Sequence, residues 1–262
     1  MGSCFPVFKD PYARRLAGKH GEEIAEAIGF SKENSWSFVA RTYLFDEFIM
    51  QHVNLGYDMV VNLAAGLDTR PYRLQLPSSL RWVEVDLPGI IEYKEKILEG
   101  EKPKCDLQRI RQDLSDEKFR KGLFETLAAK CNKALIVSEG LLSYLEDNSV
   151  GELARDLSAE KKFKRWVLDL MSPGLLELLK REMSYHLEQA NVPLKFAPQE
   201  GEGFFYPYGW KSLQSKSFLK TAAALNRLPD NLLDFASMPE PEGPKGEMPW
   251  SAVCLFENLN AA

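Results

Sequence analysis

The chain has 262 residues, of which 45% are hydrophobic, 11% aromatic and 27% charged. The length suits one large domain with an appended cap, and the composition excludes wholesale disorder because enough apolar side chains are present for a core. Lysine and arginine number 33 against 38 aspartate and glutamate, a net charge of −5 that lacks the basic field typical of nucleic-acid or anionic-membrane binding. No stretch approaches the roughly 20 apolar residues of a membrane helix, so we expect a cytoplasmic protein without a membrane or nucleic-acid partner.

Four cysteines and three histidines are scattered along the chain. No two cysteines have the Cys-x-x-Cys spacing of zinc and redox sites, and their number is too low for a disulfide scaffold. We therefore expect reduced thiols and no bound metal.

Two amphipathic stretches, at about 11–28 and 36–53, precede the first expected strand. Their apolar spacing predicts two helices. We expect these helices to form a cap or lid over the carboxyl edge of a sheet, within an N-terminal unit of residues 1–54, with the main domain at 55–262.

From residue 58 onward, short β-rich apolar runs alternate with helix-period segments, which is typical of strands and crossover helices in a parallel sheet. The expected fold class is therefore α/β. The run Ala-Leu-Ile-Val-Ser at 134–138 is almost continuously apolar, which predicts a central strand covered on both faces. Strands are predicted at about 58–64, 81–85, 107–111, 134–138 and 164–170, and helices at about 70–76, 88–99, 116–130 and 147–160.

The last third of the chain has a different pattern. Two apolar runs, at 232–237 and 250–257, are separated by a loop rich in Pro, Gly and Glu that is too short for a crossover helix, so they predict an antiparallel pair. Residues 189–209 form a long irregular stretch dense in aromatic side chains. Such stretches are usually functional or disordered, and we expect a substrate-side insertion at about 172–210, with a solvent-facing insertion as the alternative.

The most informative motif is the apolar strand that runs into Ala64-Ala65-Gly66 and then into a helix start at Thr69-Arg70. Small residues at such a turn let a ligand approach the backbone closely. Only one of the three glycines of the dinucleotide motif G-x-G-x-x-G is present, which argues against NAD or FAD. A tight strand-to-helix turn without a ligand is the alternative.

Acidic residues end the next three strands. Asp86 follows the turn by about 20 residues, the spacing at which an acid accepts the hydroxyl groups of a ribose. Asp113 and Leu114 suit an adenine amino group and ring face, although both aspartates could instead cap the helices that follow them. Glu139 ends the most apolar strand, where an ionisable group is more often functional than not.

Together these segments resemble the leucine carboxyl methyltransferase family of S-adenosyl-L-methionine-dependent methyltransferases, including its bacterial branch of polyketide-type O-methyltransferases. The resemblance extends in motifs from about residue 10 to residue 144 and more loosely to the C-terminus. One departure is Ala64, where the family commonly has Gly. The motifs are Asp10-Pro11-Tyr12, Ala40-Arg41-Thr42, Leu63-Ala64-Ala65-Gly66-Leu67-Asp68-Thr69-Arg70, Glu84-Val85-Asp86-Leu87-Pro88, Asp113-Leu114 and Glu139-Gly140-Leu141-Leu142-Ser143-Tyr144.

The resemblance implies a Rossmann-like class I methyltransferase fold, with a seven-stranded, mostly parallel sheet and an antiparallel last strand. It implies S-adenosyl-L-methionine as cofactor and S-adenosyl-L-homocysteine as product. In this resemblance Arg41 would hold the methionine carboxylate, Glu139 would lie near the ammonium group and Asp86 would bind the ribose. The cofactor-binding residues that it implies are Arg41, Ala65, Gly66, Asp86, Leu87, Asp113, Leu114, Glu139 and Gly140.

The methyl acceptor decides whether a base is needed. A carboxylate has a pKa near 4 and is ionised at neutral pH, whereas a phenol or an alcohol needs a general base. Tyr144 could hydrogen-bond the acceptor, with simple packing as the alternative, and His186 is the histidine best placed to act as a base, against a helix-surface role. Asp68 and Arg70 are expected to orient the turn through a local ion pair. Arg73 could bind an acidic substrate, but a solvated helix face is favoured.

The expected function is therefore methyl transfer to a carboxylate or hydroxyl oxygen of a small molecule or of a protein carboxyl terminus. The alternative is a non-catalytic S-adenosyl-L-methionine-binding or scaffold protein that retains the fold. A nicotinamide dehydrogenase is disfavoured by the missing glycines. The identity of the acceptor and the oligomeric state are left open.

Overall fold

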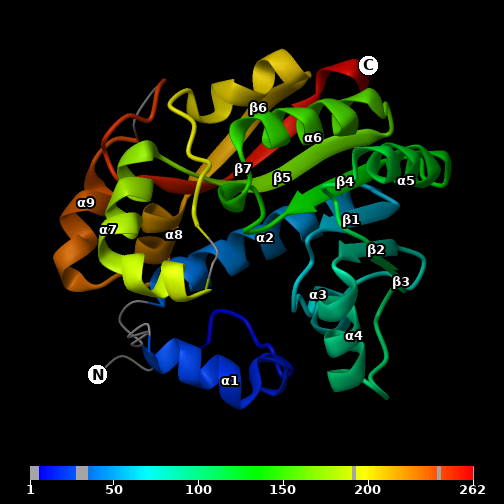
Figure 1. The fold of residues 1–262 in the computed structure, drawn as a ribbon, viewed down its shortest axis with the longest axis horizontal. Helices are drawn as coiled ribbons and strands as arrows, with labels where there is room; N and C mark the ends of the chain where they lie inside the picture. Colours follow the sequence, from blue (N-terminus) through cyan, green and yellow to red (C-terminus); the bar gives the residue numbers. More distant parts are fainter. Residues whose placement is uncertain (1–5, 28–34, 191–192, 241–242, 262) are drawn as a thin grey trace.

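The computed structural model describes residues 6–27, 35–190, 193–240 and 243–261. Its centre is a seven-stranded sheet in the order β3-β2-β1-β4-β5-β7-β6 (Figure 1). Six strands run in parallel and β7 runs antiparallel to both of its neighbours, which confirms the expected topology. The strands are β1 (Met59–Leu63), β2 (Arg81–Asp86), β3 (Asp106–Arg111), β4 (Ala134–Ser138), β5 (Phe163–Met171), β6 (Trp210–Ser217) and β7 (Ser251–Asn258).

Helices cover both faces of the sheet (Figure 1). The α-helices are α1 (Ala13–Ala27), α2 (Trp36–Asn54), α3 (Arg70–Arg73), α4 (Pro88–Ile97), α5 (Glu117–Ala129), α6 (Asp147–Ala159), α7 (Pro173–Ala190), α8 (Phe218–Ala224) and α9 (Leu233–Ser237). The 3₁₀ turns are η1 (Leu142–Tyr144), η2 (Gly201–Tyr208), η3 (Asp230–Leu232) and η4 (Leu259–Ala261).

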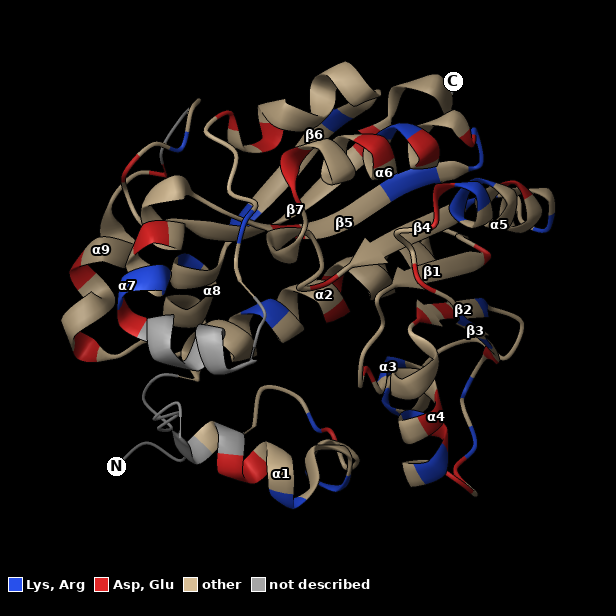
Figure 2. Cartoon of the chain, in the orientation of Figure 1, with Lys and Arg blue, Asp and Glu red and all other residues tan. Residues whose placement is uncertain are grey.

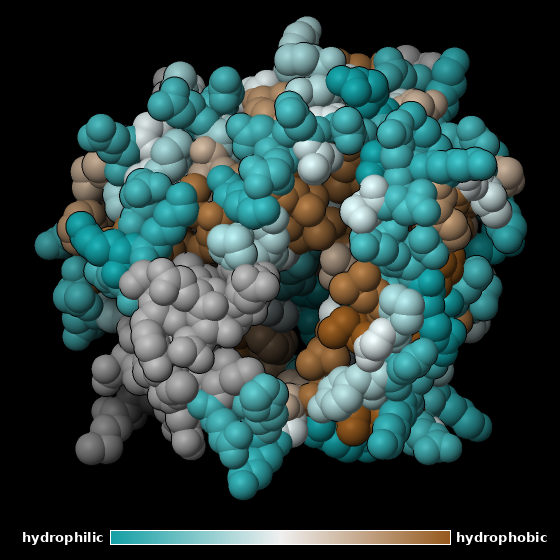
Figure 3. Space-filling view, in the orientation of Figure 1, coloured by the Kyte–Doolittle hydropathy of each residue, from teal (hydrophilic) through white to brown (hydrophobic). Residues whose placement is uncertain are grey.

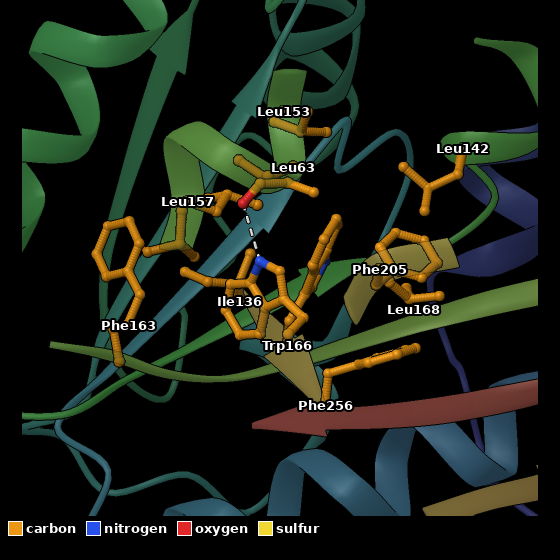
Figure 4. Close-up of a cluster of buried hydrophobic side chains, with 14 of the residues drawn as sticks. Leu63, Ile136, Leu142, Leu153, Leu157, Phe163, Trp166, Leu168, Phe205 and Phe256 are labelled. Carbon is orange, nitrogen blue, oxygen red and sulfur yellow. Dashed lines mark hydrogen bonds between the residues drawn. The ribbon is translucent and has the colours of Figure 1, made fainter. Parts of the chain in front are cut away.

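Each face of the sheet has its own apolar core, because successive side chains of a strand point to opposite faces. On one face Ile136 and Trp166 pack with α5, α6 and η2, and Figure 4 shows Leu153 and Leu157 of α6 in this cluster. On the other face Leu135 packs with α2 and α8. Every residue of β1 and β4 is buried, which explains why the sequence of these central strands is almost continuously apolar.

The predicted strand at 232–237 is wrong. That segment forms η3 and α9, and the antiparallel partner of β7 is β6, which begins at Trp210. Strand β6 lies at the edge of the sheet, and most of its side chains are partly or fully exposed, so its polar sequence shows no apolar alternation. In α9, Leu233 and Phe235 are 46% and 54% exposed. The apolar side chains of this run are therefore not those of a buried strand.

Helix α2 is part of the main core. Phe45, Phe48 and Ile49 are fully buried and pack in the same cluster as strand residues such as Val60 and Leu135. The structure therefore places the second predicted cap helix on a face of the sheet, where it buries an apolar stripe. Helix α1 packs instead beside α3 and α4, and the division of the chain at residue 54 stays a prediction.

The aromatic stretch before β6 supplies core side chains. Phe196 and Phe205 are 2% and 0% exposed, and the Phe205 ring lies 5.4 Å from the Trp166 ring and 4.9 Å from the Phe256 ring. These two aromatics therefore belong to the core on this face of the sheet, while Tyr206 of the same stretch is 65% exposed. The boundaries of the expected insertion at 172–210 remain a prediction.

Charged side chains of both signs are spread over the surface. Figure 2 shows basic and acidic residues interspersed along α4, α5, α6 and α7. Among the helices of the described segments, none combines the length and the apolar character needed to cross a bilayer.

Candidate functional site

Two adjoining cavities lie at the carboxyl edge of the sheet, and both are lined by Ala64. The first, which we call the polar cavity, has a volume of about 270 Å³ and is lined by the segment 62–70 together with Arg41 and Glu139. The second, the apolar cavity, has a volume of about 310 Å³ and is lined by the ends of β2 and β3 and by leucines. Figure 3 shows a hollow in the face of the molecule between the regions where Figure 1 draws α2 and α3.

The position of the cavities follows from the topology. Strand β1 has β2 on one side and β4 on the other, so the crossover connections diverge at β1 and leave a crevice outside its carboxyl end. Ligands of open α/β sheets bind at such a switch point. The polar cavity lies there, because its lining includes residues that follow both β1 and β4.

The turn after β1 has a left-handed backbone and is bound to the end of β2. Ala64 has φ of +52° and Gly66 has φ of +49°, a region that glycine adopts freely and alanine does not. The Gly66 N–H donates to Asp86 Oδ2 at 2.6 Å, and the Leu87 N–H donates to Asp86 Oδ1 at 2.7 Å. Asp86 is thus held in one orientation at the wall of the apolar cavity.

A buried guanidinium organises the polar cavity. Arg70 is 3% exposed, its Nε donates to Asp46 Oδ1 at 2.6 Å, and its Nη1 donates to Glu139 Oε2 at 2.7 Å. Its Nη1 also lies 3.2 Å from Asp68 Oδ2, which confirms the local ion pair expected at this turn. Burial raises the pKa of Asp68, but the charge of Arg70 outweighs it and holds that pKa below the ordinary value.

Arg41 of α2 lies between two carboxylates. Its Nε is 3.1 Å from Glu139 Oε1, and its Nη1 is 3.5 Å from Asp169 Oδ2. The Nε group is buried and has no hydrogen bond of acceptable geometry, so it is a donor that a ligand acceptor could satisfy. Burial raises the pKa of Asp169 despite the opposing charge of Arg41.

Gly140 lies beside Arg41 and has a left-handed backbone. Its φ of +67° favours glycine, while an added Cβ atom would make only an ordinary contact of 3.5 Å with Arg41 Nη1. The Gly140 N–H donates to Asp169 Oδ1 at 2.7 Å, so the loop after β4 is fixed to the end of β5.

The apolar cavity combines leucine side chains with polar groups of the loop after β3. Leu87, Leu114 and Leu141 lie in its wall, together with Asp113, whose Oδ1 accepts from the Ser115 N–H at 2.8 Å. This combination of flat apolar walls and a carboxylate suits an aromatic base that carries an amino group.

The structure brings together most of the residues predicted from sequence. Arg41, Ala65, Gly66 and Glu139 line the polar cavity, and Asp86, Leu87, Asp113 and Leu114 line the apolar cavity, while Gly140 lies beside Arg41. Tyr144 is 41% exposed in η1 and lines neither of these two cavities. His186 falls in the part of α7 whose side chains lie outside the described residues, so its role stays a prediction.

Sequence reasoning missed three residues around these cavities: Asp46, Asp169 and Arg120. A signal existed for Asp169, which is the one ionisable residue in the apolar second half of β5, from Trp166 to Met171. Asp46 is also the partner of Arg73. The Arg73 guanidinium donates to both Asp46 carboxylate oxygens, at 2.6 and 2.7 Å. The side chain of Arg73 is only 5% exposed, so the expected solvated helix face is wrong.

Two solved structures share the fold of this chain over nearly its whole length. A DUF574-family protein from Streptomyces avermitilis is 12% identical, with a TM-score of 0.59 over 97% of this chain and 98% of that one. An S-adenosyl-L-methionine-dependent methyltransferase from Anabaena variabilis is 14% identical, with a TM-score of 0.52 over 97% of this chain and 99% of that one. The fold is thus that of the Rossmann-like class I methyltransferases.

The family model described as leucine carboxyl methyltransferase matches residues 4–158, and the chain belongs to this family. Two mycobacterial relatives carry names that give S-adenosyl-L-methionine-dependent methyl transfer as an inferred activity. The Mycobacterium marinum protein is 34% identical over 128 residues, which cover 43% of this chain and only 41% of that protein. The Mycobacterium tuberculosis protein is 29% identical over 270 residues, which cover 87% of this chain and 86% of that protein.

Proposed function

We propose that this protein is an S-adenosyl-L-methionine-dependent O-methyltransferase whose acceptor is a carboxylate or hydroxyl oxygen of a small molecule or of a protein carboxyl terminus. The observation that carries the proposal is the pair of cavities that meet at Ala64, one lined by charged groups and the other by leucines and Asp86. Membership of the leucine carboxyl methyltransferase family supports it. We propose the cytoplasm as its location.

The residues present fit this cofactor. The combined volume of the two cavities lies within the range of roughly 300–1,000 Å³ that is typical of small-ligand sites. The buried Nε of Arg41 offers a donor to the methionine carboxylate, and Glu139 offers an acceptor to the ammonium group. Asp86 would accept the ribose hydroxyls and Asp113 the adenine amino group.

The role of the chain's own residues is to bind the cofactor and to orient it toward the acceptor. When bound, S-adenosyl-L-methionine supplies an electrophilic methyl group on a cationic sulfur. Asp86 is already fixed by two backbone N–H groups, and Glu139 by Arg70, so these carboxylates need little reorganisation to receive a ligand. A carboxylate acceptor is ionised at neutral pH and needs no base, whereas for a hydroxyl acceptor Tyr144 and His186 remain our proposed catalytic residues.

The first test is calorimetric titration with S-adenosyl-L-methionine and S-adenosyl-L-homocysteine. We expect micromolar binding to the unmodified chain and at least tenfold weaker binding to Arg41→Ala and Asp86→Ala, because each removes a charged hydrogen-bonding partner worth roughly 1.5–3 kcal/mol. Arg165→Ala is the matched control, because Arg165 pairs with Glu257 near the start of β5, away from both cavities.

The outcomes separate the two candidate functions. Failure to bind either ligand would overturn the cofactor proposal and favour a scaffold protein. A second outcome is that the chain binds S-adenosyl-L-methionine but transfers its methyl group to no acid or alcohol in a panel of matched acceptors. This outcome would favour a non-catalytic binding protein. Transfer to oxygen, detected by the mass of the product, would support the enzyme, and hydrolysis by base would distinguish an ester from an ether.

A further inference from the structure

Arg120 of α5 is a buried guanidinium that joins α6 to the wall of the apolar cavity. It is 5% exposed, and its Nε and Nη2 donate to Asp156 Oδ2 at 2.8 and 2.5 Å. Its Nη1 donates to the backbone carbonyl of Leu114 at 2.9 Å. The guanidinium therefore spans from a helix of the core to the loop that follows β3.

The loop after β3 is bound to the sheet at its first residue, where the Gln112 N–H donates to the Asp86 carbonyl at 2.8 Å. Its middle needs an anchor of its own. Within the loop, Asp113 Oδ1 accepts from the Ser115 N–H, and Asp116 Oδ1 accepts from the Phe119 N–H at the start of α5. These bonds fix the local shape of the loop, but they connect residues no more than three apart in sequence. The bond from Arg120 to Leu114 connects the middle of the loop to Asp156 of α6, and thus to the core of the sheet.

We propose that Arg120, held by Asp156, is a positioning residue that sets the Asp113–Leu114 loop to recognise the 6-amino group of a purine base. The inference rests on the proposed function, because it assigns the base to the apolar cavity. A carboxylate accepts a hydrogen bond from a 6-amino group but repels a 6-oxo group, which is itself an acceptor. This discrimination depends on the carboxylate standing about 3 Å from the base, and the position of Asp113 depends on the carbonyl of the next residue.

Burial makes the Arg120–Asp156 pair a rigid support. Both residues are less than 9% exposed, and removal of the Asp156 charge leaves the Arg120 guanidinium buried without its carboxylate. Asp156 itself also lies 3.7 Å from Lys121 Nζ. A purely structural pair of this kind would affect the stability of the chain and the affinity for every ligand alike. A positioning pair changes, in addition, the ratio of the affinities for two ligands that differ only at the group it helps to recognise.

The chain provides a matched control in Arg109 of β3. Its Nε donates to Glu84 at 2.9 Å and its Nη2 donates to the Tyr72 hydroxyl at 2.7 Å, so it too is a largely buried arginine bound to a carboxylate. Arg109 lines neither the polar nor the apolar cavity. We therefore expect Arg109→Lys to lower the stability while it leaves the lining of both cavities unchanged.

The experiment compares the dissociation constants of S-adenosyl-L-homocysteine and of S-inosyl-L-homocysteine, which carries a 6-oxo group instead of the 6-amino group. We expect the unmodified chain to prefer the amino ligand by well over tenfold, because a site that hydrogen-bonds a group rejects its mismatched analogue strongly. Arg120→Lys and Asp156→Asn should reduce that preference by about tenfold, which is the loss of one charge-assisted contact. Arg109→Lys should leave the preference unchanged while it lowers the melting temperature.

Each result supports or overturns the inference. An unchanged preference in the folded Arg120→Lys or Asp156→Asn variants would overturn it and leave the cofactor proposal standing. An equal loss of preference in Arg109→Lys would show a general effect of stability and would also overturn it. If Arg120→Lys does not fold, Asp156→Asn, which keeps the guanidinium and the shape of its partner, decides the matter. Failure of the unmodified chain to bind S-adenosyl-L-homocysteine would overturn both proposals together.

Discussion

The charged residues of the polar cavity are bound to one another before a ligand enters. Arg70 contacts Asp46, Asp68 and Glu139, and the three carboxylates keep the pKa of Arg70 well above its ordinary value although burial opposes its charge. Buried ion pairs are expensive to desolvate and contribute little net stability. Their benefit here is orientation, since Glu139 is held where a cationic group of a ligand would meet it.

Ala64 is the residue at which local strain can be measured. An alanine in the left-handed region costs roughly 1–2 kcal/mol, and glycine loses roughly 0.5–1 kcal/mol more entropy on folding. With φ of +52° at Ala64, we expect Ala64→Gly to raise the free energy of unfolding by about 0.5–1 kcal/mol in urea titrations without ligand. Ala65→Gly, at a buried neighbour without positive φ, should lower it, and a loss of stability in Ala64→Gly would contradict the strain.

At the scale of elements, short polar contacts fix how helices and strands meet. The start of β1 is joined to the start of β4 by Asp58, which accepts hydrogen bonds from the backbone N–H groups of Asn132 and Lys133. Helix α7 approaches the segment before β7 so closely that only glycine fits at 174, where an added Cβ atom would lie 1.8 Å from the Glu247 carbonyl oxygen. Both contacts connect segments that are more than 70 residues apart in sequence.

The contact of α7 can be tested by adding one methyl group. We expect Gly174→Ala to lower the free energy of unfolding by about 2–3 kcal/mol, because the backbone of residue 247 must move to relieve the overlap. Gly122→Ala in α5 is the control, since nothing lies within 4 Å of its added Cβ atom and alanine is the better helix former by about 0.5–1 kcal/mol. Equal effects of the two substitutions would refute the close approach.

The Asp58 contact predicts a dependence on pH. Partial burial raises the pKa of this carboxyl group, but hydrogen bonds from Lys133 and Asn132 outweigh it and hold the pKa below the ordinary value. A depressed pKa stabilises the fold above the unfolded pKa of about 3.9, and that stabilisation is lost as the pH falls through the folded pKa. Because Asp58 is largely solvated, we expect Asp58→Asn to cost only about 1 kcal/mol at pH 7.

Urea titrations from pH 3 to pH 7 check this dependence. The difference in unfolding free energy between Asp58→Asn and the unmodified chain should be constant above about pH 5 and should shrink below about pH 4. A difference that grows as the pH falls would contradict the assigned direction of the shift.

At the scale of the whole molecule, the sheet order places both cavities at one edge. The segments that line them are far apart in sequence, from Arg41 on α2 to Glu139 after β4 and Leu153 on α6. A ligand that spans both cavities would connect the two sides of the β1 switch point and stabilise the folded chain against unfolding.

This coupling predicts a thermal shift. At 100 times its dissociation constant, S-adenosyl-L-homocysteine should stabilise the fold by about 2.7 kcal/mol, which raises the melting temperature of a chain of this size by roughly 5–10 °C. Scanning calorimetry of the unmodified chain and of Asp86→Ala at the same ligand concentration checks it. A shift of equal size in Asp86→Ala would speak against ribose recognition by that carboxylate.

The sequence alone determined the central strands and the positions of the residues at their ends. Strand β4 was predictable because a strand covered on both faces must be apolar at nearly every position, and Asp86 because β2 ends in that acid after an apolar run. The left-handed turn was signalled by small residues at 64–66.

Only the tertiary structure decided the edge strand and the partners of the buried arginines. Strand β6 at the sheet edge has no apolar period that distinguishes it from a loop, while the apolar run in 232–237 forms an exposed helical turn instead. Asp46, which pairs with Arg70, and Asp156, which pairs with Arg120, come from other helices, 24 and 36 residues away along the chain. Such pairs are determined by how the elements pack together. The apolar periodicity of a segment predicts which of its faces is buried, but not which charged side chain of another segment lies against it.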